Sequence, residues 1–338
     1  MAVQSTIPPS KLLENFRDMR KKPYKEIVVF SPVGDMGQLE DFVNHASTLG
    51  IDKVADFLFI YRQGLGYKDY GLSALHATEK MPLGTSGCFF IGQALGYGLG
   101  YETIVVADLD AFLDSRKTFD EMLKIARDTG KAVVPLSKTQ KEEKPLPNYF
   151  VVNQWGVFPR RVFEKVGFEA PYSYRGGEDW ELSNRLKCAK QIQIYRQGCA
   201  IHEKTGMGIR EKAENPKKYY PYLKGLLVAF AVSTQYDFAS YFRFFAWFCY
   251  YNTFAIMLGD GALKKTVRMR DFSESDIRPQ ADFKVGLARM AVAGLSVPIT
   301  AFEAVSTLLA LKAKKMPIPN QQNESKVEGW VIDSRKPR

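Results

Sequence analysis

The chain has 338 residues, of which 46% are hydrophobic and 25% charged, and its formal net charge is +10. This length and apolar content support one large α/β domain with an appendage, and they exclude a disordered chain. The four cysteines show no paired spacing, which argues against a zinc finger or a disulfide framework and favours a reducing compartment; they are Cys88, Cys188, Cys199 and Cys249.

The positive charge favours an anionic partner. Nucleotide phosphates, an acidic membrane surface and nucleic acid all satisfy it, so charge alone does not choose among them. Residues 1–23 form a basic N-terminal segment that lacks the apolar core of a signal peptide. We therefore expect a cytoplasmic protein, either free or peripheral on the cytoplasmic face of a membrane.

Residues 25–202 alternate short apolar runs with amphipathic stretches, a pattern typical of strand and helix repeats around a mainly parallel sheet. We expect an α/β fold with a mixed, mainly parallel sheet flanked by helices. The expected strands are 26–30, 56–61, 103–107, 132–136 and 193–201, the expected helices are 38–49 and 84–100, and a charged loop is expected at 138–144.

The helix expected at 84–100 is rich in glycine and other small residues. It contains neither of the glycine patterns that cradle phosphates, so it is not a phosphate loop. Close packing of this helix against the sheet is the better explanation of its glycines.

The chain changes character after residue 208. We expect residues 216–316 to form a helical appendage rich in apolar and aromatic residues, followed by a polar tail at 317–338. None of its apolar runs reaches the length that a membrane-spanning helix needs. Two alternatives stay open: helices packed on the main domain, or helices in a membrane interface, with peripheral contact through 226–311 that the flanking lysines and arginines favour.

Asp108 and Asp110 follow the apolar strand 103–107. Residues two apart on a strand point to the same face, so both carboxylates can share a ligand at the carboxyl end of the sheet. Carboxylates in this position suit a hard divalent cation such as Mn²⁺ or Mg²⁺ that bridges to phosphate oxygens. An Asp-x-Asp tripeptide also arises by chance in a chain of this composition, so its position after a buried strand is the informative feature.

Asp179 lies in a second acidic cluster, with Glu178 and Trp180 beside it at the start of an expected helix. Carboxylates at a helix start are favoured by the helix dipole whatever their function. A general base, however, needs neighbours that adjust its proton affinity, and a like charge and an apolar wall on the acceptor side provide them. Asp179 is therefore the candidate base.

His202 ends the last expected strand and is followed by a flexible stretch that contains Lys204 and Arg210. A lone histidine is more often structural than a metal ligand, but His45 and His76 lie in no comparable context. The imidazole of His202 could complete the coordination of the ion, and Lys204 and Arg210 could bind the donor's diphosphate; a solvated surface role suits these two cations equally well.

Taken in order, these motifs resemble family 2 glycosyltransferases of the GT-A (Rossmann-like) type over about residues 25–210. The resemblance rests on Ser31-Pro32 at the end of the first strand, the small-residue helix, the Asp-Leu-Asp tripeptide, the run 160–168, the Glu-Asp-Trp cluster and His202. It implies that Ser31 and Pro32 lie on the donor side of the site.

The resemblance also implies a role for each acidic residue. Asp110 would be the main metal ligand, Asp108 would contact the ribose or the ion, and His202 would join the metal. Asp179 would deprotonate the acceptor in a direct displacement that inverts the anomeric configuration. We therefore expect a catalytic domain at 24–215 that transfers a hexose to a hydroxyl acceptor, with a lipid-linked glycan as the preferred kind.

The sequence departs from the family at residues 61–64, Tyr-Arg-Gln-Gly, where an acidic residue commonly reads the nucleotide base. Both UDP- and GDP-sugars thus remain open. An alternative is a non-catalytic module on the same fold that binds a nucleotide sugar or a glycan. A nucleic-acid-binding protein is disfavoured, because the basic residues are dispersed and no known motif interleaves them with aromatics.

Overall fold

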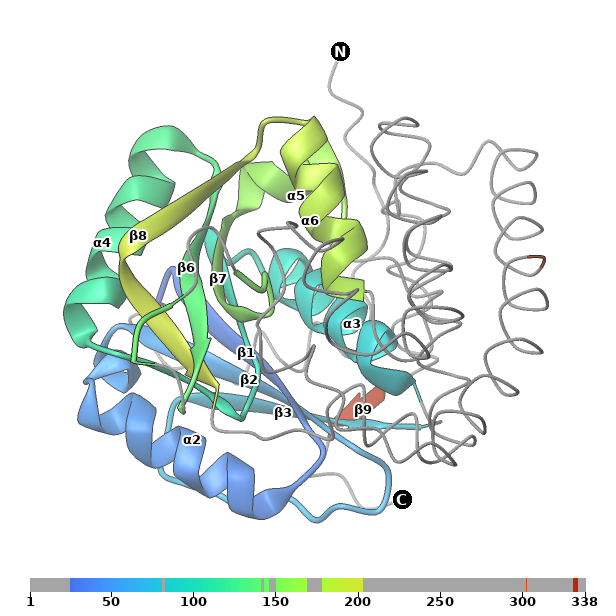
Figure 1. Ribbon diagram of the computed structural model, residues 1–338. Coiled ribbons are helices and arrows are strands. Elements are labelled where there is room, and N and C mark those ends of the chain that lie inside the picture. Colours follow the sequence, from blue (N-terminus) through green and yellow to red (C-terminus); the bar gives the residue numbers. More distant parts are fainter. Residues whose placement is uncertain are drawn as a thin grey trace, which may run out of the picture.

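The computed structural model describes residues 25–80, 83–140, 143–145, 150–168, 178–202, 302 and 331–333. These described residues form an α/β fold, with helices on both faces of one nine-stranded sheet (Figure 1). The elements in chain order are β1 (Ile27–Val33), α2 (Met36–Thr48), the 3-10 helix η1 (Ile51–Lys53), β2 (Ala55–Tyr61), β3 (Ala74–Glu79), α3 (Gly84–Gly98), β4 (Thr103–Ala107), β5 (Ala111–Leu113), α4 (Arg116–Thr129), β6 (Ala132–Thr139), β7 (Gln154–Pro159), α5 (Arg160–Val166), α6 (Glu178–Cys188), β8 (Ile192–His202) and β9 (Val331–Asp333).

The strands follow the order β5-β8-β6-β7-β4-β1-β2-β3-β9. The pairs β1 with β2, β1 with β4, β2 with β3, and β6 with β8 are parallel. Strands β5, β7 and β9 run against their neighbours, so the other six described strands share one direction. The expected mixed, mainly parallel sheet is thereby confirmed.

The central strands are apolar along their whole length because both of their faces are covered. In β1, Phe30 lies opposite Leu58 of β2 on one side and Val106 of β4 on the other, and all three side chains are fully buried. Strands of this kind need no alternation of polar and apolar residues, which is why short continuous runs predicted them.

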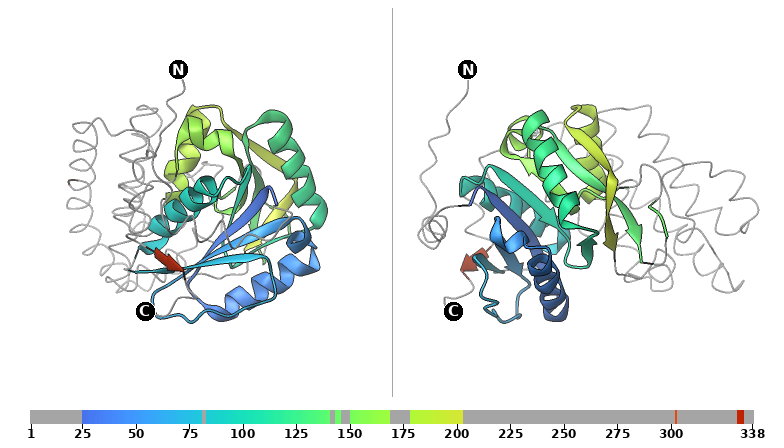
Figure 2. Two further views of the ribbon diagram at one scale, coloured as in Figure 1. Left: turned by 180° about the vertical axis from the view of Figure 1, so that it is seen from behind. Right: turned by 90° about the vertical axis from the view of Figure 1, so that its left-hand side faces the viewer.

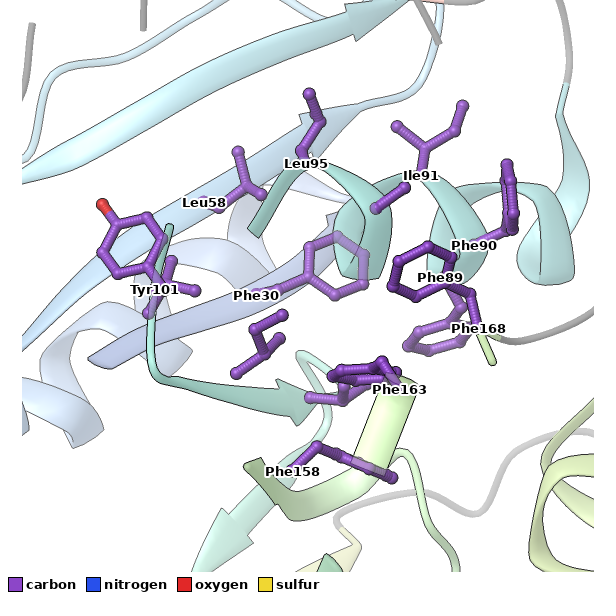
Figure 3. Close-up of a cluster of buried hydrophobic side chains, with 14 of the residues drawn as sticks. Phe30, Leu58, Phe89, Phe90, Ile91, Leu95, Tyr101, Phe158, Phe163 and Phe168 are labelled. Carbon is purple, nitrogen blue, oxygen red and sulfur yellow. The ribbon is translucent and has the colours of Figure 1, made fainter. Parts of the chain in front are cut away.

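Helix α3 packs tightly on one face of the sheet. A side chain at Gly92 would overlap the ring of Phe30, and one at Gly96 would press on Ile104 at 3.0 Å. Figure 3 shows how closely Phe30 and Phe89 approach in this cluster, with their ring centroids 5.8 Å apart. The prediction that close packing explains the glycines of this helix is confirmed for Gly92 and Gly96.

Helices α5 and α6 complete the same face. Phe163 from α5, Phe168 just after it, and Leu182 and Leu186 from α6 belong to the same buried cluster as α3. Helix α6 is thus held by apolar contacts along one side. Its first turn carries the acidic cluster described below.

Helices α2 and α4 cover the opposite face (Figure 1). Asp35 caps the start of α2 by accepting hydrogen bonds from the Gly37 and Gln38 amides, and Ser115 caps α4 in the same way. Helix α4 ends at Gly130, whose φ of 63° is the left-handed conformation that glycine adopts readily. These local signals fix where both helices begin and end.

The charged loop expected at 138–144 begins later than predicted, because β6 continues through Lys138 and Thr139, which pair with Ile201 and His202 of β8. Within the expected polar tail, residues 331–333 form β9, which runs antiparallel to β3 at the edge of the sheet (Figure 2). The N-terminal segment 1–23 and the appendage 216–316 lie outside the described residues, apart from Phe302. None of the helices in the described part of the chain combines the length and apolar character that crossing a bilayer requires.

Candidate functional site

Asp108 and Asp110 lie in a tight turn between β4 and β5, and not on the strand itself. The Ala111 amide donates to the Asp108 carbonyl at 3.2 Å, and the Asp108 amide donates to the Asn153 carbonyl at 2.8 Å. Leu109 between them is 5% exposed and packs into the core, whereas both aspartates are only partly buried. The two carboxylates are therefore placed by a turn anchored on Leu109, and the strand period invoked from the sequence is not what aligns them.

His202 lies beside Asp110 although 92 residues separate them, because β5 leaves the turn and, as the edge strand, pairs with β8. Ala111 is opposite His202 in this antiparallel pair. As a result, His202 Nε2 lies 3.3 Å from Asp110 Oδ1, and the two side chains are 24% and 22% exposed. The structure thus brings together a carboxylate oxygen and an imidazole nitrogen, both partly exposed, at the carboxyl end of the strands.

The separation of these two atoms fits a shared divalent cation. Two ligands that bind one Mg²⁺ or Mn²⁺ ion at right angles lie about 3 Å apart, because each is about 2.1 Å from the metal. Among the described residues, no group of three or more His, Cys, Asp and Glu side chains is arranged to hold a metal ion. Sites that also use substrate phosphates and water need only one or two protein carboxylates, so the pair is compatible with such an ion.

Asp179 lies in the first turn of α6, where Glu178 and Trp180 flank it along the helix, and its side chain is partly exposed. The last turn of α6 leads into β8 within three residues, and the Gln191 amide donates to the Leu186 carbonyl across this connection. The start of α6 therefore points toward the carboxyl ends of the strands. Asp110 and His202 lie at the same ends of the strands.

A buried arginine ties α6 to the end of α5. The Arg185 guanidinium donates to both carboxylate oxygens of Glu181, at 3.1 and 2.6 Å. It also donates to the carbonyls of Val166 and Phe168, both at 2.9 Å, and so ties α6 to the end of α5. Because Arg185 is 6% and Glu181 2% exposed, the link is shielded from water.

Ser31 is fully buried, and its hydroxyl donates to the carbonyl of Ala107, the residue before Asp108. Its side chain thus ties β1 to the end of β4, next to the acidic turn. Pro32, which follows, is partly exposed at the same edge. A contact of either residue with a donor stays a prediction.

Strand β3 ends in a buried carboxylate that was not predicted from the sequence. Glu79, the last residue of β3, is 5% exposed and accepts from the thiol of Cys88 at 2.9 Å and from the Gln63 amide at 3.4 Å. Burial and this carboxylate raise the pKa of the Cys88 thiol far above its ordinary value. Glu79 thus places a buried carboxylate at the end of β3, next to the residue that follows Arg62 after β2.

Other predicted site residues lie outside the described part of the chain. They are Lys204 and Arg210, the two cations expected to bind the diphosphate. Their roles remain predictions.

Two residues that were not predicted form hydrogen bonds to the acidic turn: Asn153, just before β7, and Trp155, in β7. Asn153 accepts the Asp108 amide, and the indole Nε1 of Trp155 donates to the Ala111 carbonyl at 2.7 Å. The signal that could have revealed them is Gly156, because an isolated glycine in a strand pattern often marks a bulge.

No protein-family model and no curated protein sequence matches the chain. Its structure is similar to that of the mannosyltransferase PcManGT from Pyrobaculum calidifontis in complex with GDP-Man and Mn²⁺, at 12% identity and a TM-score of 0.45, over 89% of this chain and 81% of that one. It is also similar to S. aureus TarS 1-349 with UDP-GlcNAc, at 8% identity and a TM-score of 0.43, over 67% and 72% of the two chains.

A third similar structure is GalNAc-T7 with UDP, GalNAc and Mn²⁺, at 12% identity and a TM-score of 0.46, over 80% of this chain and 57% of that one. Because all identities are low and the TM-scores stay below 0.5, we base the functional assignment on the chain's own residues.

Proposed function

We propose that the chain is a metal-dependent glycosyltransferase of the GT-A type, similar to family 2, that transfers a hexose from a UDP- or GDP-sugar to a hydroxyl acceptor. The observation that carries the proposal is the 3.3 Å approach of His202 Nε2 to Asp110 Oδ1 at the carboxyl edge of the sheet. In open α/β sheets this edge is where ligands bind. Two ligand types suited to one cation meet there from distant parts of the chain.

Asp110 and His202 would hold a divalent cation, Mn²⁺ or Mg²⁺, with Asp108 contacting the ion or the donor's ribose. When bound, such an ion neutralises the negative charge that develops on a departing nucleoside diphosphate. The turn presents both aspartates while Leu109 keeps its backbone fixed in the core. The backbone that carries the carboxylates would therefore be ordered before the donor arrives, which lowers the cost of binding.

Asp179 would act as the general base. Its carboxylate would take the proton of the acceptor hydroxyl as that oxygen forms a bond to the anomeric carbon and the bond to the diphosphate breaks, which inverts the configuration. Glu178 and Trp180 would line the acceptor side. Arg185 supports this role, because its hydrogen bonds to the Val166 and Phe168 carbonyls hold the helix that carries Asp179.

The donor and the acceptor would be recognised by different parts of the chain. Ser31 and Pro32 would lie on the donor side, and Lys204 and Arg210 would bind the diphosphate. The catalytic domain would span 24–215, and the segment 226–311 would touch the cytoplasmic face of a membrane, where a lipid-linked glycan is the acceptor that fits best. The net charge of +10 suits both the diphosphate and an anionic membrane surface.

A panel of UDP- and GDP-sugars tests the donor and the metal together. A ligand that binds only the folded state raises the melting temperature, and saturation at 100 times the dissociation constant adds about 2.7 kcal/mol. We expect one nucleotide to stabilise the chain with Mn²⁺ and to lose that effect in EDTA. Asp110→Asn should abolish the metal-dependent part of the shift.

Asp179→Asn separates an enzyme from a binding module. This variant should keep the metal-dependent shift and lose sugar transfer and donor hydrolysis. Turnover equal to that of the unmodified chain would remove Asp179 as the base. A wild-type chain that shows the shift but neither transfers nor hydrolyses the sugar would be the non-catalytic module.

A further inference from the structure

Strand β7 contains a bulge next to the turn that carries Asp108 and Asp110. Along β4, Val106 pairs with Gly156 but Ala107 pairs with Gln154, so Trp155 is an extra residue without a partner in the ladder. Its backbone is left-handed, with a φ of 64°. A bulge of this kind redirects a strand locally and is common next to functional sites.

The left-handed backbone at Trp155 is unfavourable, because a bulky residue at positive φ crowds its own carbonyl. Such a conformation persists only where the surroundings hold it. Here the indole is fully buried, stacks on Phe42 with centroids 5.4 Å apart and meets the ring of Phe119 edge-on. Gly156 makes the bulge possible, because any side chain there would overlap the carbonyl of Val152.

The bulge contacts both ends of the turn that carries Asp108 and Asp110. The Asn153 carbonyl accepts the Asp108 amide at 2.8 Å before the turn, and the Trp155 indole donates to the Ala111 carbonyl at 2.7 Å after it. Ala111 and Trp155 are both fully buried, so no water can replace this bond. The turn is thereby held between two hydrogen bonds from one short segment.

We infer that Trp155 is a positioning residue, which sets the conformation of the acidic turn through its bond to the Ala111 carbonyl and so keeps Asp110 beside His202. This inference rests on the proposed function for its metal-binding consequence, but the structural link to the turn is independent of it. Groups that orient metal ligands in this way typically contribute about 10- to 100-fold to metal affinity.

Trp155→Phe tests the inference, because phenylalanine keeps a ring in the same buried position and removes the donor to Ala111, together with part of the ring volume that the control accounts for. The matched control is Phe57→Leu, which alters a buried ring of the same core on β2. The first readout is residue-resolved amide hydrogen exchange at Asp108 and Ala111, compared with amides of β1. We expect exchange at the turn to accelerate at least about tenfold over β1 in Trp155→Phe and to keep the wild-type ratio in the control.

The second readout is the dissociation constant of Mn²⁺ measured with saturating UDP or GDP. It should rise about 10- to 100-fold in Trp155→Phe, while nucleotide affinity in EDTA changes less than about twofold. Unchanged exchange at the turn, or unchanged Mn²⁺ affinity in a chain that binds Mn²⁺, would overturn the inference. If the wild-type chain shows no Mn²⁺-dependent nucleotide binding while the turn still exchanges faster in Trp155→Phe, the proposed function fails and the positioning link stands.

Discussion

The ion pair between Arg185 and Glu181 offers the sharpest test of how the site is supported. Arg185→Met keeps the aliphatic stem of the side chain and removes the guanidinium. The buried Glu181 carboxylate loses the two hydrogen bonds from this cation, and the carbonyls of Val166 and Phe168 lose this donor. Three buried acceptors thus lose the same cation at once.

The expected loss of stability is large because the pair is shielded from water. Removing one partner of a buried ion pair costs about 3 to 5 kcal/mol, whereas an exposed pair contributes about 1 kcal/mol or less. For a domain of this size the loss corresponds to a fall in melting temperature of roughly 6 to 20 °C. The double variant Glu181→Leu with Arg185→Met should recover part of it, because the stranded carboxylate is then gone while the two carbonyls still lack their donor.

Urea unfolding of the two variants measures these differences directly. Lys68→Met is the matched control, because Lys68 forms an ion pair with Glu40 in which both side chains are more than half exposed. We expect the control to unfold at the wild-type midpoint. A loss below about 1 kcal/mol for Arg185→Met would refute the reasoning, since it would show that the guanidinium is not needed to satisfy Glu181. Near-normal donor binding with reduced turnover in Arg185→Met would further indicate that the pair acts through the position of Asp179.

Two further variants test the packing and the electrostatics of the core. Gly92→Ala should destabilise the chain by about 1 to 3 kcal/mol, because its methyl group would overlap the ring of Phe30. Gly66→Ala is the control and should leave stability unchanged, because open space surrounds Gly66. Equal unfolding midpoints for the two variants would contradict the close packing. Burial lowers the pKa of His45, whose ring lies against Phe112. As the pH falls, His45 is therefore protonated at a higher pH in the unfolded chain than in the folded one, and stability is lost as the pH falls through 6.5. Denaturant unfolding at pH 7.5 and 5.5 should therefore show a smaller loss for His45→Phe than for the wild-type chain, and an equal loss in both would exclude this contribution.

The central strands were predicted well from the sequence, because burial on both faces produces a continuous run of apolar residues. The expected strand 103–107 coincides with β4, and the expected strand 56–61 begins one residue after β2 does. The helix expected at 38–49 is α2 shifted by two residues at its start, since the capping role of Asp35 was not recognised. Local sequence was therefore sufficient to predict these strands and this helix.

Features that depend on distant contacts could not be predicted in this way. Strand β5 is three residues long and exists only because β8 pairs with it. The bulge at Trp155 requires Phe42, Phe119 and the turn after β4, none of which is close to it in sequence. A turn closed by the bond from the Ala111 amide to the Asp108 carbonyl, with Leu109 buried inside it, stands where a strand was expected to align Asp108 and Asp110.

The meeting of Asp110 and His202 follows from how the register of β8 is set. Opposite β6, Pro135 pairs with Tyr195 and Leu136 with Cys199, so three residues leave the ladder and the strand resumes at Cys199. Asp114, just after β5, fixes this new start: its carboxylate accepts the Cys199 amide at 2.9 Å, and its own amide donates to the Cys199 carbonyl at 3.0 Å.

The two strands then run antiparallel from this point until Ala111 faces His202. A shift of one residue would turn the imidazole to the other face of the sheet, because successive side chains alternate. The place where β8 resumes is itself constrained, since a side chain at Gly198 would overlap Thr118 of α4. The candidate metal ligands are therefore brought together by backbone hydrogen bonds at Cys199, three residues away from the site they create.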